Sequence, residues 1–229
     1  MNAATAEERE LLATGTRILG RHGMIGMFGH VSLLTEADPQ RYLLSPGAGR
    51  RKDLCRPEQL FELGLDDVFE VGRPLELYLH AELHRARPEL RTLIHVHSPN
   101  LTALAGMAEP PGELLMIHAA FWPERIPLWE RPELVTNHAM AREFVAGLGD
   151  SALALLRWHG AVIVGRTLQE AVFRTVLAEY HAGIVLASLA HGRELAPVTV
   201  DRGPLYATTL PPTTHELFWR FESSYVELD

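Results

Sequence analysis

The sequence predicts an α/β fold in which a mixed β-sheet is covered by helices. Two observations predict it. Short apolar runs alternate with amphipathic segments that carry helix-capping signals, and some neighbouring runs are separated only by turns, which indicates hairpins within the sheet. The chain has 229 residues, 47% of them apolar, so it can bury a sizeable core. We therefore expect a single domain over residues 1–229.

The first quarter of the chain is predicted to form a helix followed by a hairpin. Thr5 and Glu8 have the spacing of a capping box, and the glycines within 20–23 supply the conformation that ends a helix. Residues 27–34 and 41–44 have strand character, and the turn between them is polar.

The middle of the chain is predicted to run from helix to strand to helix. Pro74 precedes a helical pattern over 75–87, which a second proline closes. Residues 91–97 alternate as a strand, and Ser98 with the proline after it can cap a helix over 100–105.

Later elements follow from the same signals. We expect a helix over 137–145, strands over 152–156 and 161–164, a long helix over 168–190 opened by a second capping box, and a last helix capped by Thr214. Strands and helices thus alternate along most of the chain.

Composition excludes several classes of partner. The net charge of -8 opposes binding to nucleic acid, and no run of about 18 apolar residues predicts a membrane span. The start of the chain is polar and acidic, unlike a signal peptide. With a single cysteine, Cys55, these features predict a soluble cytoplasmic protein without nucleic-acid or membrane partners. Twelve histidines raise the expectation of a metal or proton-transfer site.

Four side chains form the candidate metal site. His95 and His97 lie two residues apart in a predicted strand, so both imidazoles project from one face. His159 lies in a turn before a glycine that allows close backbone approach, and Glu76 on the preceding helix can add a carboxylate. Spacing alone is insufficient, because such a histidine pair often occurs without a metal. The default interpretation of the following histidines is structural or superficial: His80, His84, His118, His138, His181 and His191.

Four segments in order carry a resemblance to a known family. They are FGHVS at 28–32, LLSPGA at 43–48, PLELYLHAELHRARPELRTLIHVHSP at 74–99 and LLRWHGAVIVGRTLQEAV at 155–172. Through them the stretch 7–190 resembles the class II aldolase and adducin head-domain family.

The resemblance implies a three-layer α/β/α sandwich with a mostly antiparallel sheet. It also implies a homotetramer with active sites at subunit interfaces. Position by position, the family's metal ligands fall on His95, His97 and His159. Its proton-transfer residue, which also binds the metal when substrate is absent, falls on Glu76.

The sequence departs from the phosphosugar aldolases of that family. It has His30 where they have asparagine, and Pro74 and Leu75 where they have two hydroxyl residues that grip phosphate. Neither Pro74 nor Leu75 can donate a hydrogen bond to an anion. The GHVS form is similar to branches that include adducin heads and decarboxylases of hydroxylated aromatic acids.

Further residues are candidates for binding substrate. Besides His30, Ser45 and Gly47 in a tight turn can offer hydrogen-bond donors to a carboxylate, and Arg50 or Arg73 can pair with one. Residues 200–229 are expected to contribute to a subunit interface, with Tyr206 completing a neighbouring pocket. For each, an ordinary turn, surface or core role is the alternative.

The sequence therefore predicts a divalent-metal-dependent carbon–carbon lyase. One reaction that fits is decarboxylation of a small hydroxy-carboxylic acid, aromatic acids included. The other is aldol cleavage through a metal-stabilised enolate. The alternatives are a sugar-phosphate aldolase or epimerase, an iron-dependent oxygenase, and a non-catalytic adducin-like scaffold. Zinc is the first choice of metal, and manganese, iron and cobalt fit the same ligands.

Overall fold

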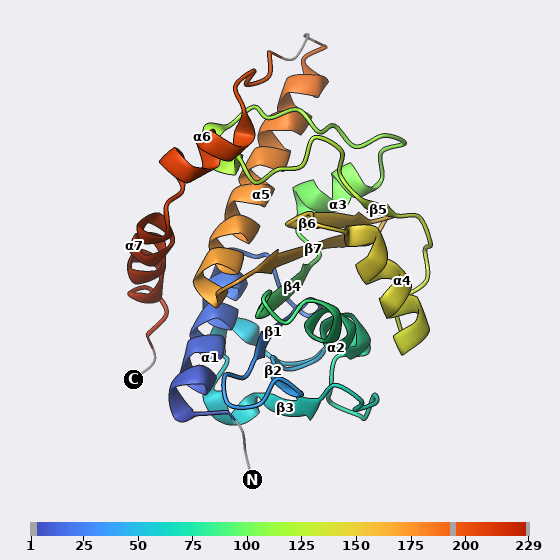
Figure 1. Cartoon of the computed structure of the whole chain (residues 1–229), viewed down its shortest axis with the longest axis vertical. Helices are drawn as coiled ribbons and strands as arrows, with labels where there is room; N and C mark the ends of the chain where they lie inside the picture. Colours follow the sequence, from blue (N-terminus) through green and yellow to red (C-terminus); the bar gives the residue numbers. More distant parts are fainter. Residues whose placement is uncertain (1–3, 193–195, 228–229) are drawn as a thin grey trace.

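A mixed sheet of seven strands runs through the computed structural model, which describes residues 4–192 and 196–227 (Figure 1). The strand order is β3-β2-β1-β4-β7-β6-β5. The strands are β1 (His30–Leu34), β2 (Arg41–Leu44), β3 (Phe61–Gly64), β4 (Thr92–Val96), β5 (Leu128–Trp129), β6 (Leu153–Leu156) and β7 (Gly160–Gly165). Every neighbouring pair is antiparallel except β5 and β6. The expected mixed, mostly antiparallel sheet is confirmed.

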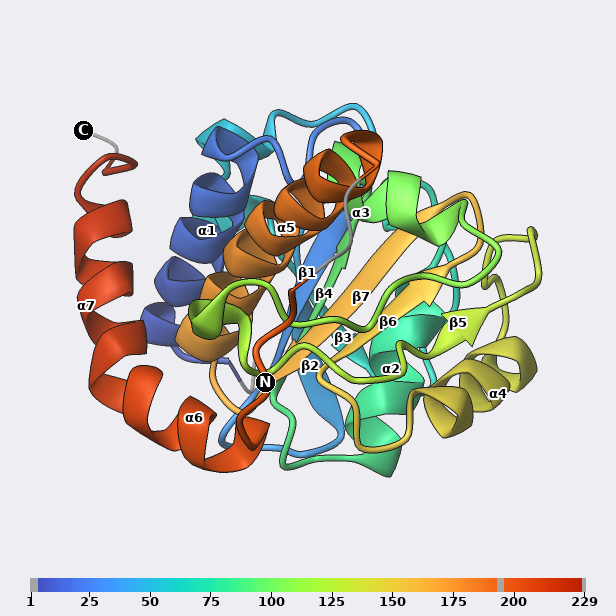
Figure 2. The same cartoon turned by 90° about the horizontal axis from the view of Figure 1, so that it is seen from above.

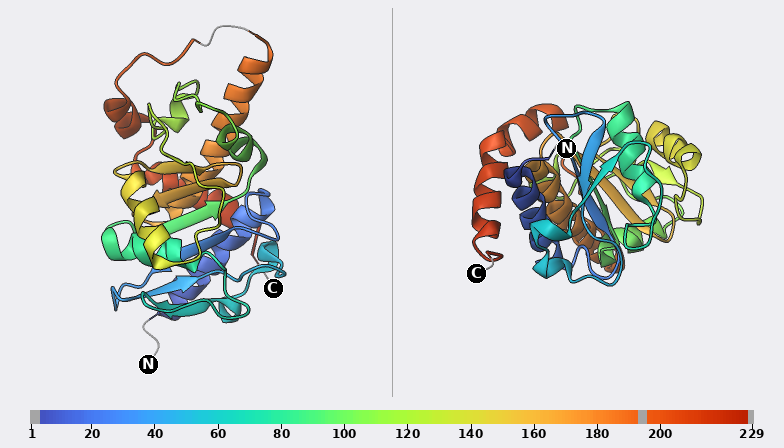
Figure 3. Two further views of the ribbon diagram at one scale, coloured as in Figure 1. Left: turned by 90° about the vertical axis from the view of Figure 1, so that its right-hand side faces the viewer. Right: turned by 90° about the horizontal axis from the view of Figure 1, so that it is seen from below.

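Helices cover both faces of this sheet. They are α1 (Ala6–Arg21), α2 (Leu77–Ala86), α3 (Pro99–Ala105), α4 (His138–Leu148), α5 (Leu168–Ala190), α6 (Arg202–Thr209) and α7 (Pro212–Ser223). Helices α1, α3 and α5 lie on one face, and α2 and α4 on the other (Figure 2). Helix α7 packs outside the first layer, along α1 and α5 (Figure 3). The expected three-layer sandwich is therefore confirmed.

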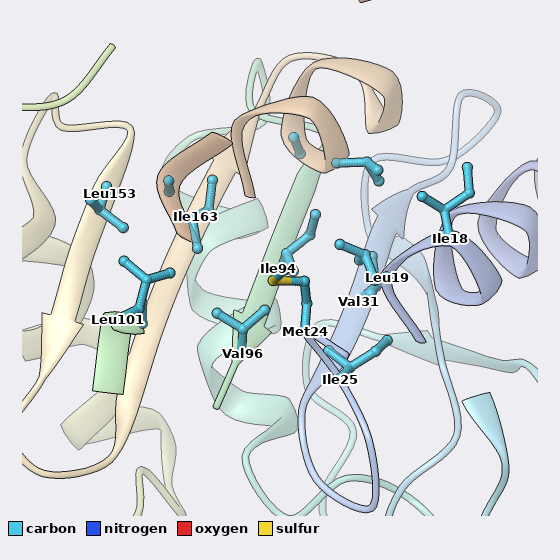
Figure 4. Close-up of a cluster of buried hydrophobic side chains, with 14 of the residues drawn as sticks. Ile18, Leu19, Met24, Ile25, Val31, Ile94, Val96, Leu101, Leu153 and Ile163 are labelled. Carbon is cyan, nitrogen blue, oxygen red and sulfur yellow. The ribbon is translucent and has the colours of Figure 1, made fainter. Parts of the chain in front are cut away.

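Alternation along the strands divides the apolar residues into two cores. Ile94 and Val96 of β4 project toward α1 and α5, and Figure 4 shows them with Val31, Ile163 and Ile18. Leu93, the residue before Ile94, belongs to the second core, beneath α2 and α4. The side chain of His95, between Ile94 and Val96, follows the same alternation. The strand thereby places His95 on the α2 side of the sheet.

The predicted ends of several elements differ from the structure. The capping box of Thr5 and Glu8 makes both of its hydrogen bonds, and α1 ends just before Gly23, whose φ is 70°. Thr214, however, lies inside the first turn of α7, because Pro211 occupies the cap position. Strands β3 and β5 and helix α6 were not predicted.

Helix α5 has the length and mean hydropathy of a membrane span among the described residues, but half of that apolar window is buried inside the molecule. Its buried face packs against α1, α3 and β7, as in the core helix of an α/β protein. The predicted domain over 1–229 and the predicted interface segment over 200–229 include chain ends, residues 1–3 and 228–229, that lie outside the described residues.

Candidate metal centre and active site

Three histidines from two segments converge on the α2 side of the sheet. His95 lies in β4, His97 directly follows it, and His159 lies in the turn between β6 and β7. Their ring centroids are 4.6 to 4.9 Å apart. Together with Glu76, each offers one ligand atom, and the four atoms lie within 4.8 Å of one another. We call these four residues the metal centre.

The turn that carries His159 is held against β4 by close backbone contact. A Cβ atom at Gly160 would lie 2.1 Å from the carbonyl oxygen of Val96, so only glycine fits there. Trp158 has a φ of 55°, which is unusual for a bulky residue and is the sharp part of the turn. The sequence predicted a close approach at this glycine, and the structure has it.

Glu76 joins the centre from the residue that precedes α2. Its Oε1 atom accepts a hydrogen bond from the Val135 N–H at 3.0 Å. Its Oε2 atom lies 3.3 Å from His95 Nε2 and 3.6 Å from His159 Nε2. Burial acts to raise the pKa of Glu76, but His95 and then His159 outweigh burial and bring the pKa to about 2. Glu76 is therefore a carboxylate at neutral pH.

The nitrogen atoms of the metal centre fit a divalent cation. His95 Nδ1–H donates to the Ala161 carbonyl at 3.1 Å, which leaves a lone pair on Nε2 facing the other ligands. His159 Nε2 is buried and has no hydrogen-bond partner among the described residues. Burial, followed by the neighbouring histidines, lowers the pKa of His97 to about 3 and also lowers the pKa of His159. Neutral imidazoles with converging lone pairs are what a metal ion requires.

A cavity of about 580 Å³ opens in front of the metal centre. Its walls are largely apolar, and Phe28 stacks on His97 with centroids 5.8 Å apart. The apolar lining residues are Phe28, Phe69, Val71, Pro74, Leu75 and Leu134. The basic residues that line it, besides the histidines, are Lys52 and Arg73. A flat apolar ring can occupy such a cavity with its polar groups against the metal centre.

A buried hydrogen-bond chain extends from the cavity into the sheet–helix layer. His30 Nδ1 lies 2.6 Å from His80 Nε2, His80 Nδ1 lies 2.6 Å from Ser32 Oγ, and Ser32 Oγ lies 2.8 Å from His84 Nε2. The chain forms because residues two apart in β1 and four apart in α2 face each other. It fixes the ring of His30, which lines the cavity and whose Nδ1 is used by His80.

Of the residues predicted to bind substrate, His30 and Gly47 line the cavity. Ser45 is fully buried outside the lining, and its Oγ accepts a hydrogen bond from the Val31 N–H at 2.9 Å. The Gly47 N–H donates to the Gly72 carbonyl at 3.3 Å. Ser45 therefore lies outside the cavity, and the N–H of Gly47 is already bonded to the backbone.

The other predicted residues lie elsewhere or are already paired. Tyr206 in α6 donates to Glu170 at 3.1 Å and accepts from Arg174 at 3.0 Å, and it does not line the cavity. Its contribution to a neighbouring subunit stays a prediction. Arg73 lines the cavity but forms an ion pair with Glu70 at 3.0 Å. Arg50 borders a different hollow.

Lys52 lines the cavity but was not predicted to belong to the site. The residue follows two arginines, and a basic triplet of this kind predicts solvated side chains. No local pattern distinguishes Lys52 from Arg51. His80 and His84 were expected to be structural or superficial, and both are buried in the hydrogen-bond chain. Ser32, which joins them, was not predicted to have a role.

Comparisons with known proteins agree with this geometry. The family model described as class II aldolase and adducin N-terminal domain matches residues 9–186. The 3,4-dihydroxyphthalate decarboxylase of Terrabacter sp. (strain DBF63) is 30% identical over 236 residues, covering 97% of this chain and 98% of that protein. The protein of the same name from Arthrobacter keyseri is 28% identical over 205 residues, covering 83% of this chain and 82% of its own.

A solved structure shares the fold. The aldolase II superfamily protein from Pseudomonas syringae superposes with a TM-score of 0.81 at 18% identity, covering 96% of this chain and 92% of that one. The family and the cluster of three histidines and a glutamate together indicate a divalent metal.

Proposed function

The chain belongs to the class II aldolase and adducin N-terminal domain family, and we propose that it is a metal-dependent lyase that decarboxylates a dihydroxylated aromatic acid. The observation that carries the proposal is the convergence of three imidazoles and one carboxylate at the floor of an apolar cavity. The buried, unpartnered Nε2 atom of His159 gives that convergence a chemical purpose, because a buried acceptor without a partner is costly.

An aromatic substrate is supported by the cavity walls and by the relatives. Pro74 and Leu75 line the cavity at the position where the phosphosugar aldolases carry hydroxyls, so the wall there offers a phosphate no side-chain donor. Phe28 and Leu134 add apolar surface on which a ring can lie. The two relatives described above are named for 3,4-dihydroxyphthalate, an aromatic ring with two carboxylates and two hydroxyls.

Glu76 is placed to move the proton that decarboxylation requires. A divalent ion bound at the metal centre supplies a Lewis acid for negative charge on the substrate oxygens. Glu76 takes the proton of the hydroxyl adjacent to the leaving carboxylate and returns it to the ring carbon that bears that carboxylate. Carbon dioxide then leaves, and the electron pair of the broken bond restores the aromatic ring and a negative oxygen, which solvent protonates.

The surrounding residues orient and shield this reaction. The Val135 N–H holds one oxygen of Glu76, so the other oxygen is the one that faces the histidines. His30 is fixed through His80 and lines the cavity. The apolar walls exclude water, which strengthens the electrostatic contacts inside.

The metal, the oligomeric state and the cellular location are further parts of the proposal. Zinc suits the nitrogen-rich ligand set, and manganese, iron and cobalt are the alternatives. A homotetramer is supported by exposed apolar side chains on α7, among them Leu217 and Phe221. A cytoplasmic location is supported by the free, buried thiol of Cys55.

The test is a substrate comparison with zinc-loaded protein. Carbon dioxide and aldehyde are measured separately with 3,4-dihydroxyphthalate and with sugar 1-phosphates. We expect carbon dioxide and a dihydroxybenzoate from the first and no aldehyde from the second. Aldehyde release from a sugar phosphate without decarboxylation would instead support the aldolase alternative, and folded protein that takes up no metal would support the scaffold.

A further inference from the structure

Lys52 is a buried cation without an acidic partner. The residue begins a 3-10 turn, Lys52–Leu54, and only 2% of it is exposed. Its Nζ donates to the Met27 carbonyl at 3.2 Å. No Asp or Glu among the described residues lies within ion-pair distance of it. Both neighbouring cations are neutralised, Arg51 by Asp53 and Arg73 by Glu70.

The backbone fixes where this ammonium group sits. A Cβ atom at Gly20 would lie 2.7 Å from the backbone nitrogen of Asp53 and 2.9 Å from its Cα atom. The 3-10 turn therefore rests directly on the end of α1, and only glycine allows that contact. Because the turn is held there and Nζ is tied to Met27, the side chain of Lys52 stays at the cavity wall.

An unpaired buried cation is expensive and is seldom retained for packing. Removing an ammonium group from water carries a large desolvation cost unless an anion compensates it. Burial lowers the pKa of Lys52 to about 8, so the group still carries a proton at neutral pH. The cavity that Lys52 lines is otherwise apolar except for the metal centre, His30 and Arg73. Lys52 borders two hollows: this cavity, which holds the metal centre, and a smaller one that Asp53 also lines. The cavity with the metal centre is the one in which a bound substrate can supply the missing anion.

We propose that Lys52 binds a second carboxylate of the substrate, the one that is retained when the other leaves as carbon dioxide. This inference rests on the proposed function and narrows its substrate class to aromatic dicarboxylates with adjacent hydroxyls. The reacting carboxylate and hydroxyls face Glu76 and the metal centre, while the ring lies between the apolar walls. The retained carboxylate completes an ion pair with Lys52 and offsets the cost of burying it.

The test measures binding of two probes that differ by one carboxylate. Isothermal titration of the zinc-loaded protein with 3,4-dihydroxybenzoate and with catechol gives the preference for the carboxylate. We expect the wild type to bind 3,4-dihydroxybenzoate about 10- to 100-fold more tightly than catechol, the range of a charge-assisted hydrogen bond. In Lys52→Met this preference falls to about onefold while catechol affinity stays unchanged.

Two further variants sharpen the result. Arg51→Met removes a positive charge from the residue next to Lys52, where Arg51 forms an exposed ion pair with Asp53. This variant should keep the wild-type preference. Lys52→Gln keeps a donor without the charge and should lose most of the preference. Thermal unfolding checks the fold, and Lys52→Met should melt no lower than wild type, because an apolar side chain replaces an unpaired cation.

Each outcome decides between the readings. Equal loss of affinity for both probes in Lys52→Met, no loss for either, or no preference in the wild type would overturn the assignment of Lys52. A preference that depends on Lys52 in protein that releases no carbon dioxide from 3,4-dihydroxyphthalate would retain this inference and reject the decarboxylase proposal.

Discussion

Two groups of histidines lie against each other in this protein, and their ring nitrogens are arranged differently. In the buried hydrogen-bond chain, His30, His80 and His84 are linked through Ser32 by contacts of 2.6 to 2.8 Å. In the metal centre, nitrogens face one another, and one of them has no hydrogen-bond partner among the described residues. The ring of His30 is only 5.1 Å from that of His95.

The difference shows that the convergence of ligand atoms, rather than burial, identifies a metal site. Burial lowers the pKa of histidines in both groups. In the buried hydrogen-bond chain, His84 Nδ1 also lacks a partner among the described residues, but it does not belong to a cluster of ligand atoms. The metal centre turns three imidazoles and a carboxylate to a single point, where a cation can bind all four. Counting histidines could not have made this distinction.

The largest expected effect is on the metal centre. His97→Ala removes one of three imidazole ligands, so metal content should fall below half of the wild-type value and turnover by at least ~1,000-fold. Elemental analysis and a carbon dioxide assay measure these. His118→Ala, an exposed histidine, is the matched control and should change neither. Full metal content in His97→Ala would remove this residue from the ligand set.

Glu76→Gln should separate proton transfer from metal binding. The amide keeps the shape of the side chain and loses the charge, so turnover should fall by about 10²- to 10⁴-fold, the usual contribution of a general acid–base group. Metal stoichiometry should stay at the wild-type value, because the three imidazoles remain. Parallel loss of metal and turnover would mean that Glu76 acts chiefly as a ligand.

Ser32→Ala should affect stability without affecting the metal. It leaves ring nitrogens of His80 and His84 without their common partner, so the free energy of unfolding should fall by about 1–3 kcal/mol. Urea denaturation measures the loss, and metal content should be unchanged. The exposed Ser224→Ala is the control and should remain within about 0.5 kcal/mol of wild type. A loss of metal in Ser32→Ala would show that the two groups are coupled.

The smallest expected effect is a dependence of stability on pH in metal-free protein. Burial lowers the pKa of His84 to about 3, so the unfolded chain binds its proton below about pH 6.5 while the folded chain does not. Stability from this group is therefore complete above that pH and declines as pH falls toward 3. Between pH 7.5 and 5 the loss from His84 should be about 2 kcal/mol.

Urea denaturation at the two pH values tests this in wild type and in His84→Gln, which cannot titrate. The variant should show a shallower decline. An identical decline in both proteins would mean that His84 gains its proton in the folded state as easily as in the unfolded one.

Local signals explain which parts of the fold could be predicted. The Thr167 side chain accepts from the Glu170 N–H, as its capping box indicated, and α5 has the predicted bounds. Strand β5 has two residues and pairs in parallel with β6, so neither length nor alternation could reveal it. Helix α6 contains Pro204, which hid it, although a proline in the first turn of a helix is tolerated.

Local patterns likewise predicted some residues of the candidate site and could not predict others. Alternation in β4 and the glycine after His159 predicted the grouping of the metal centre, and the structure brings all four residues together. The positions of Ser45 and Lys52 depend on packing between distant segments, such as the contact of Gly20 with the 3-10 turn. No pattern of neighbouring residues encodes that contact, so the sequence did not reveal that Ser45 lies outside the cavity lining or that Lys52 belongs to it.

The metal centre draws its ligands from three places: the start of α2, the end of β4 and the turn between β6 and β7. An ion shared by all of them would act as a crosslink between segments that span residues 76–159 of the chain. A hundredfold excess of such an ion over its dissociation constant would add about 2.7 kcal/mol to the free energy of unfolding. Scarcity of the metal would then make the protein more susceptible to proteolysis and would also abolish its activity.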